Sequence, residues 1–306
     1  MKPRCFSVLI LLALLVAGCE GATSTPIPLP ATASPTNTSP PVSVVTETSE
    51  ATPLPANPSC DEWYTLPVIP SVSEKMRVVY EQGQASGNNP RAFSKVGDGE
   101  ISTAWFLTAF DLGNGYYDLG PFENLLPTIE HFPGSFGRIG VAARRGFNTQ
   151  RILVPALSSG DLCAIGESPL ACELRLHRPA FAILSLGTNQ VWQPEEFEQG
   201  MRQILDILLA NNTVPILSTK GDNLEGDHRI NRIIACLAQD YDAPLWNFWS
   251  AIQPLPNQGL QADLEHLTYG GTDFADQRAM QTAWTVRNLT ALQALDAVWR
   301  GVTGTP

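Results

Sequence analysis

The sequence is poor in positive charge. It contains 19 Lys and Arg residues against 30 Asp and Glu residues, for a formal net charge of −11. Removal of an N-terminal leader containing Lys2 and Arg4 leaves 17 basic residues and a net charge of −13. Such an excess of acidic groups opposes binding to nucleic acid or to anionic lipid surfaces through bulk charge. We therefore expect no nucleic-acid partner.

Long hydrophobic runs are also lacking. The one apolar run, "CFSVLILLALLVAG", is shorter than the ~20 residues that span a bilayer, and it follows a short basic start. It is typical of a secretory signal, and its end, "LVAGC", resembles the bacterial lipobox. The resemblance implies a signal peptide over 1–18 and diacylation of Cys19 after cleavage. An ordinary cleaved signal with an incidental cysteine is the alternative.

Aromatic residues are absent from residues 20–58, where Thr, Ser, Ala and nine prolines dominate. Such a segment cannot bury enough apolar surface to fold. We therefore expect a lipidated cysteine and a disordered linker over 19–59, followed by one domain over 60–306. The protein would be exported and lipid-anchored to the outer face of the bacterial cell membrane or the cell envelope.

Metal-binding motifs are lacking as well. The domain has four cysteines but no CxxC motif, and no histidine stands beside a cysteine to complete a ligand set. Cys163 and Cys172 bracket a short loop with turn residues, which favours a local disulfide in an exported chain. The sequence leaves open whether Cys60 and Cys236 pair. We expect no metal and no cofactor.

Short apolar segments alternate with longer amphipathic ones in this domain. Five runs are typical of buried parallel strands: 91–98, 151–157, 180–187, 213–220 and 244–249. Helical periodicity marks three others: 194–212, 227–241 and 276–299. This alternation predicts a three-layer α/β/α, doubly wound and mostly parallel sheet of flavodoxin-like type, with ligands at the carboxyl ends of the strands.

Four turn segments fall at these strand ends: "VGDGE" (96–100), "ARRGFN" (143–148), "LGTNQ" (186–190) and "DLEHLT" (263–268). Their order and spacing resemble the SGNH or GDSL family of serine hydrolases. The resemblance covers most of the chain from about Phe93 to Tyr269. It implies an SGNH-hydrolase-like fold and a small acyl-ester or carbohydrate ligand.

The resemblance also assigns roles. His266 would be the catalytic base, with Asp263 orienting its ring. Gly146 and Asn189 would help to bind the oxyanion. The nucleophile position is occupied by Gly99, which retains a backbone N–H but has no hydroxyl. Hydrolysis is therefore expected to be lost or weak, and Glu100 adds a carboxylate that opposes a developing oxyanion.

Other roles remain open for the neighbouring residues. Ser102 is a possible substitute nucleophile, although a simple polar role in the first helical turns is favoured. Asp98 belongs to the predicted site but would equally cap a helix that begins after Gly99. Trp192 either packs or forms an aromatic platform for a sugar ring. We treat the remaining histidines as structural: His131, His177 and His228.

Three functions are compatible with these residues. The first is a surface lipoprotein whose cleft binds an acyl or sugar group with little or no hydrolysis. The second is an active esterase that uses Ser102 or a water activated by His266. The third is a noncatalytic carbohydrate-binding or envelope adhesion module.

The lipobox predicts that Cys19→Ser abolishes lipidation, because the thiol of Cys19 is the acyl acceptor. In a bacterial host, metabolic labelling with an alkyne fatty acid should label the unsubstituted chain and not the variant. Cys5→Ser is the control and should remain labelled. A Cys19→Ser protein that is still acylated and membrane-bound would show that the anchor lies elsewhere.

Overall fold

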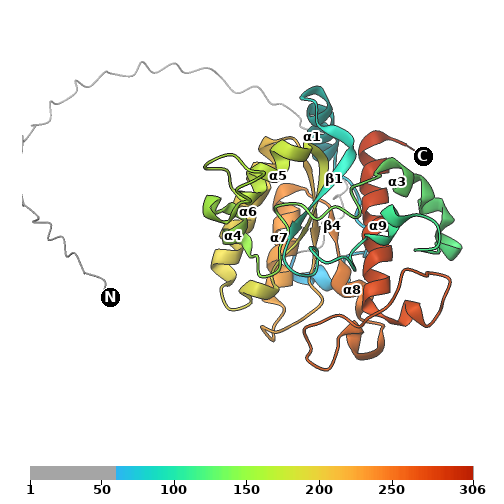
Figure 1. The fold of residues 1–306 in the computed structure, drawn as a ribbon. Helices are drawn as coiled ribbons and strands as arrows, with labels where there is room; N and C mark the ends of the chain where they lie inside the picture. Colours follow the sequence, from blue (N-terminus) through green and yellow to red (C-terminus); the bar gives the residue numbers. More distant parts are fainter. Residues whose placement is uncertain (1–59, 306) are drawn as a thin grey trace, which may run out of the picture. The chain divides into compact units, whose positions relative to one another are not determined.

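The computed structural model describes residues 60–305. The predicted signal peptide, Cys19 and the linker lie outside these residues. A four-stranded parallel sheet occupies the centre, in the order β1 (Asn89–Gly97), β2 (Pro179–Ser185), β3 (Val214–Ser218) and β4 (Leu245–Trp246) (Figure 1). Gly97 pairs with Ser185 and Leu217 with Leu245, so the strands end at a common edge.

An isolated parallel bridge extends this order. Gly97 pairs with Ala143 on the side of β1 that faces away from β2. The Gly97 N–H donates to the Ala142 carbonyl, and the Arg144 N–H donates to the Gly97 carbonyl. If the bridge is counted as an edge strand, the chain order across the sheet is 2-1-3-4-5, which is the flavodoxin-like order. The order reverses at β1, so the turn after Gly97 lies at the switch point where such sheets bind ligands.

Helices cover both faces of the sheet. One face packs against α1 (Glu74–Ala85) and α9 (Ala283–Thr303), and the other against α5 (Pro169–His177), α6 (Pro194–Ala210) and α7 (Arg229–Tyr241). Alternate strand residues enter the two hydrophobic cores, as Ile183 and Leu184 show. The predicted three-layer α/β/α fold is thus confirmed. In the described part of the chain, no helix is both long and apolar enough to cross a membrane.

The remaining helices are short. They comprise α2 (Ala109–Leu112), α3 (Leu126–His131), α4 (Thr149–Leu153) and α8 (Phe248–Ile252). Six 3-10 turns complete the elements: η1 (Cys60–Thr65), η2 (Gly120–Leu125), η3 (Pro155–Leu157), η4 (Thr188–Gln190), η5 (Pro256–Gly259) and η6 (Ala279–Gln281). The loop between α8 and α9 lies at the lower edge of Figure 1.

Three local predictions were wrong. Residues 151–157 form the end of α4 and η3 rather than a strand, because Asn148 caps a helix here and Pro155 then ends it. In 244–249 the strand is limited to β4, since Asn247 caps α8 directly afterwards. No helix begins at Gly99. Residues 99–108 form turns, and Asp98 Oδ1 accepts from the Glu100 N–H within this turn instead of capping a helix.

Two disulfides brace the domain. Cys163 pairs with Cys172 across nine residues, and Cys60 pairs with Cys236 across 176 residues. The second bond joins η1 to α7, so it fixes the start of the described chain to the helical layer.

The two loop lengths predict unequal contributions to stability. Closing a 176-residue loop removes more entropy from the unfolded chain than closing one of nine. The loop-entropy relation gives about 5 kcal/mol against about 2.5 kcal/mol. In urea denaturation, replacing Cys60 and Cys236 with Ala should therefore cost more stability than replacing Cys163 and Cys172. Equal losses would contradict this ranking.

Candidate active site

The turn after β1 is built by close approach of two backbones. A Cβ at Gly97 would lie 2.0 Å from the Ser185 carbonyl oxygen, so no larger residue fits there. The Asp98 N–H continues the strand pairing by donating to the same oxygen. At Gly99, by contrast, the atom nearest to an added Cβ would be Arg145 Cγ, at 3.7 Å. A serine side chain would therefore fit at position 99.

The second and third motifs meet beside this turn. Arg145, on the segment that bridges to β1, is the residue that a Cβ at position 99 would meet, and Gly146 follows it with a φ of +78°, a conformation that favours glycine. From the end of β2, the Asn189 amide donates to the Phe147 carbonyl at 2.9 Å. The structure thus brings the Gly99, Gly146 and Asn189 segments together at the switch point.

Asp263 and His266 form a hydrogen-bonded pair on the loop between α8 and α9. His266 Nδ1 lies 2.8 Å from Asp263 Oδ2, while Asp263 Oδ1 accepts from the backbone N–H groups of Glu265 and His266. These backbone hydrogen bonds and the imidazole hold the pKa of Asp263 at about 2. The same carboxylate raises the pKa of His266. The arrangement leaves Nε2 as the nitrogen that can exchange a proton with a ligand.

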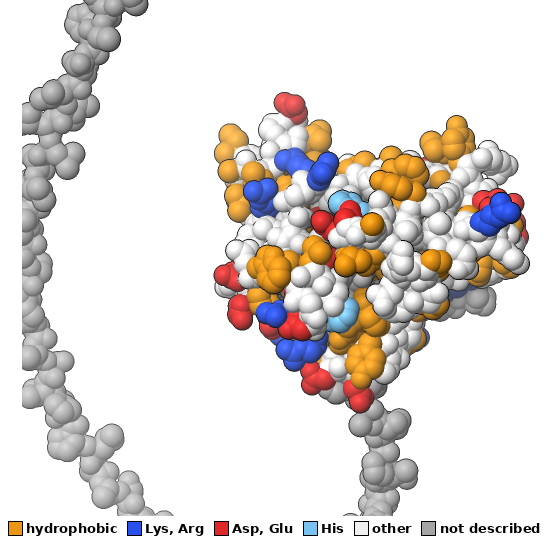
Figure 2. All heavy atoms as spheres, turned by 90° about the horizontal axis from the view of Figure 1, so that it is seen from below, with side chains coloured by type: hydrophobic (Ala, Val, Ile, Leu, Met, Phe, Trp, Pro, Cys, Tyr) orange, Lys and Arg blue, Asp and Glu red, His pale blue; other side chains and the backbone are white. Residues whose placement is uncertain are grey.

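The His266 pair belongs to the same electrostatic environment as the β1 turn. The charge of Glu100 raises the pKa of His266, and His266 in turn lowers that of Glu100, although burial gives the Glu100 carboxyl a raised pKa overall. Both His266 and Asp263 remain largely exposed. Viewed from below, the molecular surface shows histidine side chains near acidic and hydrophobic groups (Figure 2).

Arg287 lies beneath the turn and was not foreseen from the sequence. Its side chain, on α9, is fully buried, and it pairs with Glu100 at 3.3 Å and donates to Ser185 Oγ at 2.8 Å. Four aromatic rings surround its guanidinium: Phe106, Trp246, Phe248 and Trp284. The only sign of this residue in the sequence is a single arginine within an apolar helical stretch, and that sign does not identify Glu100 as its partner.

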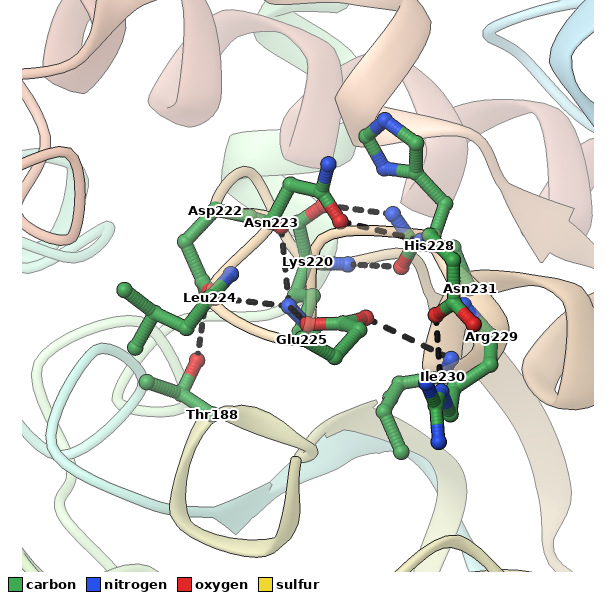
Figure 3. Close-up of polar contacts among 11 residues, drawn as sticks. Thr188, Lys220, Asp222, Asn223, Leu224, Glu225, His228, Arg229, Ile230 and Asn231 are labelled. Atoms are coloured by element: carbon green, nitrogen blue, oxygen red, sulfur yellow. Dashed lines mark hydrogen bonds and ion pairs between the residues drawn. The ribbon is translucent and has the colours of Figure 1, made fainter. Parts of the chain in front are cut away.

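A second buried cation supports the Asn189 turn (Figure 3). Lys220, at the end of β3, pairs with Asp222 at 2.6 Å and with Glu225 at 2.7 Å. The other Asp222 oxygen accepts from the Thr188 hydroxyl at 2.6 Å, which ties this loop to the turn that carries Asn189. Asp222 and Glu225 are thus used to bind Lys220, and Asp222 also positions a neighbouring turn, whereas Asp227 pairs with Arg229.

The other predicted residues have simpler surroundings. Ser102 Oγ donates to the Gly99 carbonyl at 3.3 Å, so its hydroxyl stabilises the turn. Trp192 is 74% exposed. His131 stacks on Trp299, and His228 lies among Trp63 and Trp249.

One group of potential metal ligands occurs within residues 60–305, formed by Cys163, Glu167 and Cys172. Both of its sulfur atoms are bonded in the disulfide, so neither is available as a thiolate ligand.

Comparison with known proteins agrees with the motifs. No family model matches the chain. Over 137 residues the chain is 31% identical to thioesterase 1/protease 1/lysophospholipase L1 of Escherichia coli (strain K12), a match that covers 42% of this chain. It spans 66% of that relative, slightly less than two thirds of its length. Together with the motifs, this match indicates an SGNH/GDSL hydrolase-like domain.

Solved structures of this family show limited overlap with the present domain. A putative acylhydrolase from Bacteroides fragilis superposes with a TM-score of 0.44 at 12% identity, covering 72% of this chain and 95% of that one. A GDSL-like lipase from Bacteroides thetaiotaomicron gives 0.42 at 13% identity, covering 72% and 97%. These TM-scores and identities are too low to support any statement about function.

The raised pKa of Asp98 predicts a distinctive dependence of stability on pH. Burial, followed by the neighbouring Glu100 charge, raises the pKa of Asp98 from 3.8 to about 7. Between these values the folded chain retains a proton that the unfolded chain releases, so the free energy of unfolding falls as pH rises, by at most about 1.4 kcal/mol per pH unit. Asp98→Asn should show a smaller decline than the unsubstituted chain in urea denaturation between pH 4 and 7, since Glu100, whose pKa burial also raises, remains.

The control for this experiment is Asp161→Asn, at an exposed position, which should retain the decline of the unsubstituted chain. If Asp98→Asn and the unsubstituted chain lose stability at the same rate over this range, then Asp98 does not hold a proton in the fold.

Proposed function

We propose that this SGNH/GDSL domain binds a small acyl-ester or carbohydrate ligand and that its hydrolytic activity is lost or weak. The observation that carries the proposal is the combination of a side-chain-free Gly99 with a complete Asp263–His266 pair. The base and its orienting carboxylate are present, whereas the nucleophile position has no hydroxyl.

Each remaining group has a role in binding a carbonyl. Backbone N–H groups at Gly99 and Gly146 and the side-chain amide of Asn189 are donors suited to an oxygen that carries partial negative charge. His266 supplies a further donor when it is protonated, and its raised pKa favours that form. Such a set holds a carbonyl group whether or not a bond is then broken.

The missing hydroxyl has a large expected cost. In subtilisin, removing the nucleophile lowers turnover by about 10⁶-fold, while the oxyanion donors and binding leave a small residual rate. Glu100 adds to the deficit, since a carboxylate near the oxyanion position opposes the charge that develops there. Its pairing with Arg287 reduces this opposition without removing it.

The principal alternative is an active esterase. A water activated by His266 would need only the pair that is already present. Ser102 is the weaker candidate, because its hydroxyl already bonds to the Gly99 carbonyl within the turn. A third alternative, a noncatalytic carbohydrate-binding or adhesion module, requires ligand binding and no hydrolysis.

The proposal includes a location. Acyl chains on Cys19 would anchor the chain to the outer face of the bacterial membrane or envelope, and the 19–59 linker would extend the domain from it. The ligand would then be encountered outside the cell.

Gly99→Ser is the direct test. With 4-nitrophenyl acetate as substrate, the variant should hydrolyse at least about 100-fold faster than the unsubstituted chain, short of the ~10⁶ that a full nucleophile is worth, because Glu100 remains. The restored rate should rise with pH through a value above 6.5, since Asp263 raises the pKa of the His266 base and only the neutral ring accepts a proton.

Three further variants complete this test. His266→Ala in the Gly99→Ser background should abolish the gain, and Ser102→Ala should leave it unchanged. Glu100→Gln should increase it, because the side chain keeps its size and a polar oxygen facing Arg287 while the negative charge is gone. A fluorophosphonate should label position 99 of the variant and leave the unsubstituted chain unlabelled.

Two results would contradict the proposal. If the unsubstituted chain already matches Gly99→Ser, catalysis has not been lost. If the folded Gly99→Ser protein stays at the background rate, the β1 turn is not a nucleophile turn.

A further inference from the structure

Two exposed aromatic side chains, each on a segment that carries candidate site residues, contact each other. Trp105 is 54% exposed and Tyr269 is 62% exposed, yet their ring centroids are only 5.5 Å apart, with the ring planes tilted by 49°. Isolated exposed aromatics are common on protein surfaces, but a contacting pair that leaves more than half of each side chain in water is not explained by core packing.

The chain positions of the pair link it to the site. Trp105 lies five residues after Glu100, in the turn segment that follows β1. Tyr269 lies three residues after His266, on the loop between α8 and α9. The contact between the two rings therefore joins the segment of the nucleophile position to the segment of the catalytic base.

Helix α9 holds both segments in place. The Asn288 amide donates to the Trp105 carbonyl at 3.0 Å, and Asn288 Oδ1 accepts from the Leu107 N–H. Next to Tyr269, the Thr268 carbonyl accepts from the Trp284 N–H. With both backbones anchored, the rings are preorganised, which lowers the entropy cost of binding a ligand on them.

We infer that Trp105 and Tyr269 form a stacking platform for a neutral, hydroxyl-rich sugar ring. The apolar faces of a pyranose match exposed aromatic rings, and its hydroxyl groups match the carboxylate acceptors nearby. This inference names the ligand class of the proposed function. It rests on that proposal only in taking the neighbouring Gly99 and His266 segments to form the ligand site.

The charges around the platform favour a neutral ligand. Asp263 and Glu265 are acidic and stand on the segment that carries Tyr269, so an anionic ligand meets repulsion. A quaternary ammonium ion would suit aromatic rings beside carboxylates. However, the positive charge of Arg287 neutralises the negative charge of Glu100, and the raised pKa of His266 favours a protonated imidazole, which would repel a cationic ligand. A neutral sugar avoids both conflicts.

The test is isothermal titration calorimetry on the mature full chain. The probes are xylohexaose, cellohexaose, mannohexaose and chitohexaose as neutral ligands, with hexagalacturonate and tetramethylammonium as charged ones. At least one neutral oligosaccharide should bind at millimolar concentration or below. Trp105→Ala and Tyr269→Ala should each weaken this binding about tenfold or more, whereas Trp105→Phe should retain most of it.

Tyr116→Ala is the matched control, since Tyr116 is equally exposed at 59% on another segment, and binding should be unchanged. Circular dichroism melting of each variant verifies that it is folded. The inference is overturned if no neutral oligosaccharide binds, if hexagalacturonate or tetramethylammonium binds in preference, or if binding is indifferent to Trp105→Ala.

The outcome is separable from that of the proposed function. Sugar binding is measured on the chain with Gly99 in place and needs no hydrolysis. A positive sugar titration with an inactive Gly99→Ser protein would support the platform and refute the nucleophile turn. The reverse result would refute the platform alone.

Discussion

The ion pair between Arg287 and Glu100 is the constraint on which the site depends. A guanidinium with no exposed surface must have partners, because an unpaired buried charge is strongly unfavourable. Burial lowers the pKa of Arg287, and the Glu100 charge acts in the opposite direction. Since the partners stand at the ends of β1 and β2, the pair ties α9 to the switch point of the sheet.

This pairing changes the interpretation of Glu100. From the sequence, its carboxylate was a charge that intrudes on an oxyanion site, and an apolar replacement would seem favourable. In the structure such a replacement would leave the Arg287 guanidinium without its carboxylate partner among four aromatic rings. The carboxylate is therefore part of the scaffold that holds Arg287 in the core. Lys220 plays a comparable part for the Asn189 turn through Asp222.

Local motifs and long-range pairs differed in how well the sequence indicated them. The three-layer fold and the strands at 91–98, 180–187 and 213–220 were predictable, since buried parallel strands are continuous apolar runs. Residues 151–157 were misassigned because a short apolar run does not distinguish a strand from a buried helical turn. Arg287 and Glu100 are 187 positions apart. No periodicity or spacing rule connects them, so the pair that organises the site was visible only in three dimensions.

The two glycines of the β1 turn differ in what packing requires of them. At Gly97 a Cβ would lie 2.0 Å from a backbone oxygen, so packing alone requires glycine. At Gly99 the nearest contact would be an ordinary 3.7 Å to the flexible side chain of Arg145, so packing permits a larger residue. Glycine at position 99 is therefore not a requirement of the fold. The Asn189 segment packs beside this turn, and the Glu100 charge links it to the Asp263–His266 pair, so the proposed loss of hydrolysis depends on a side chain that the fold leaves free to vary.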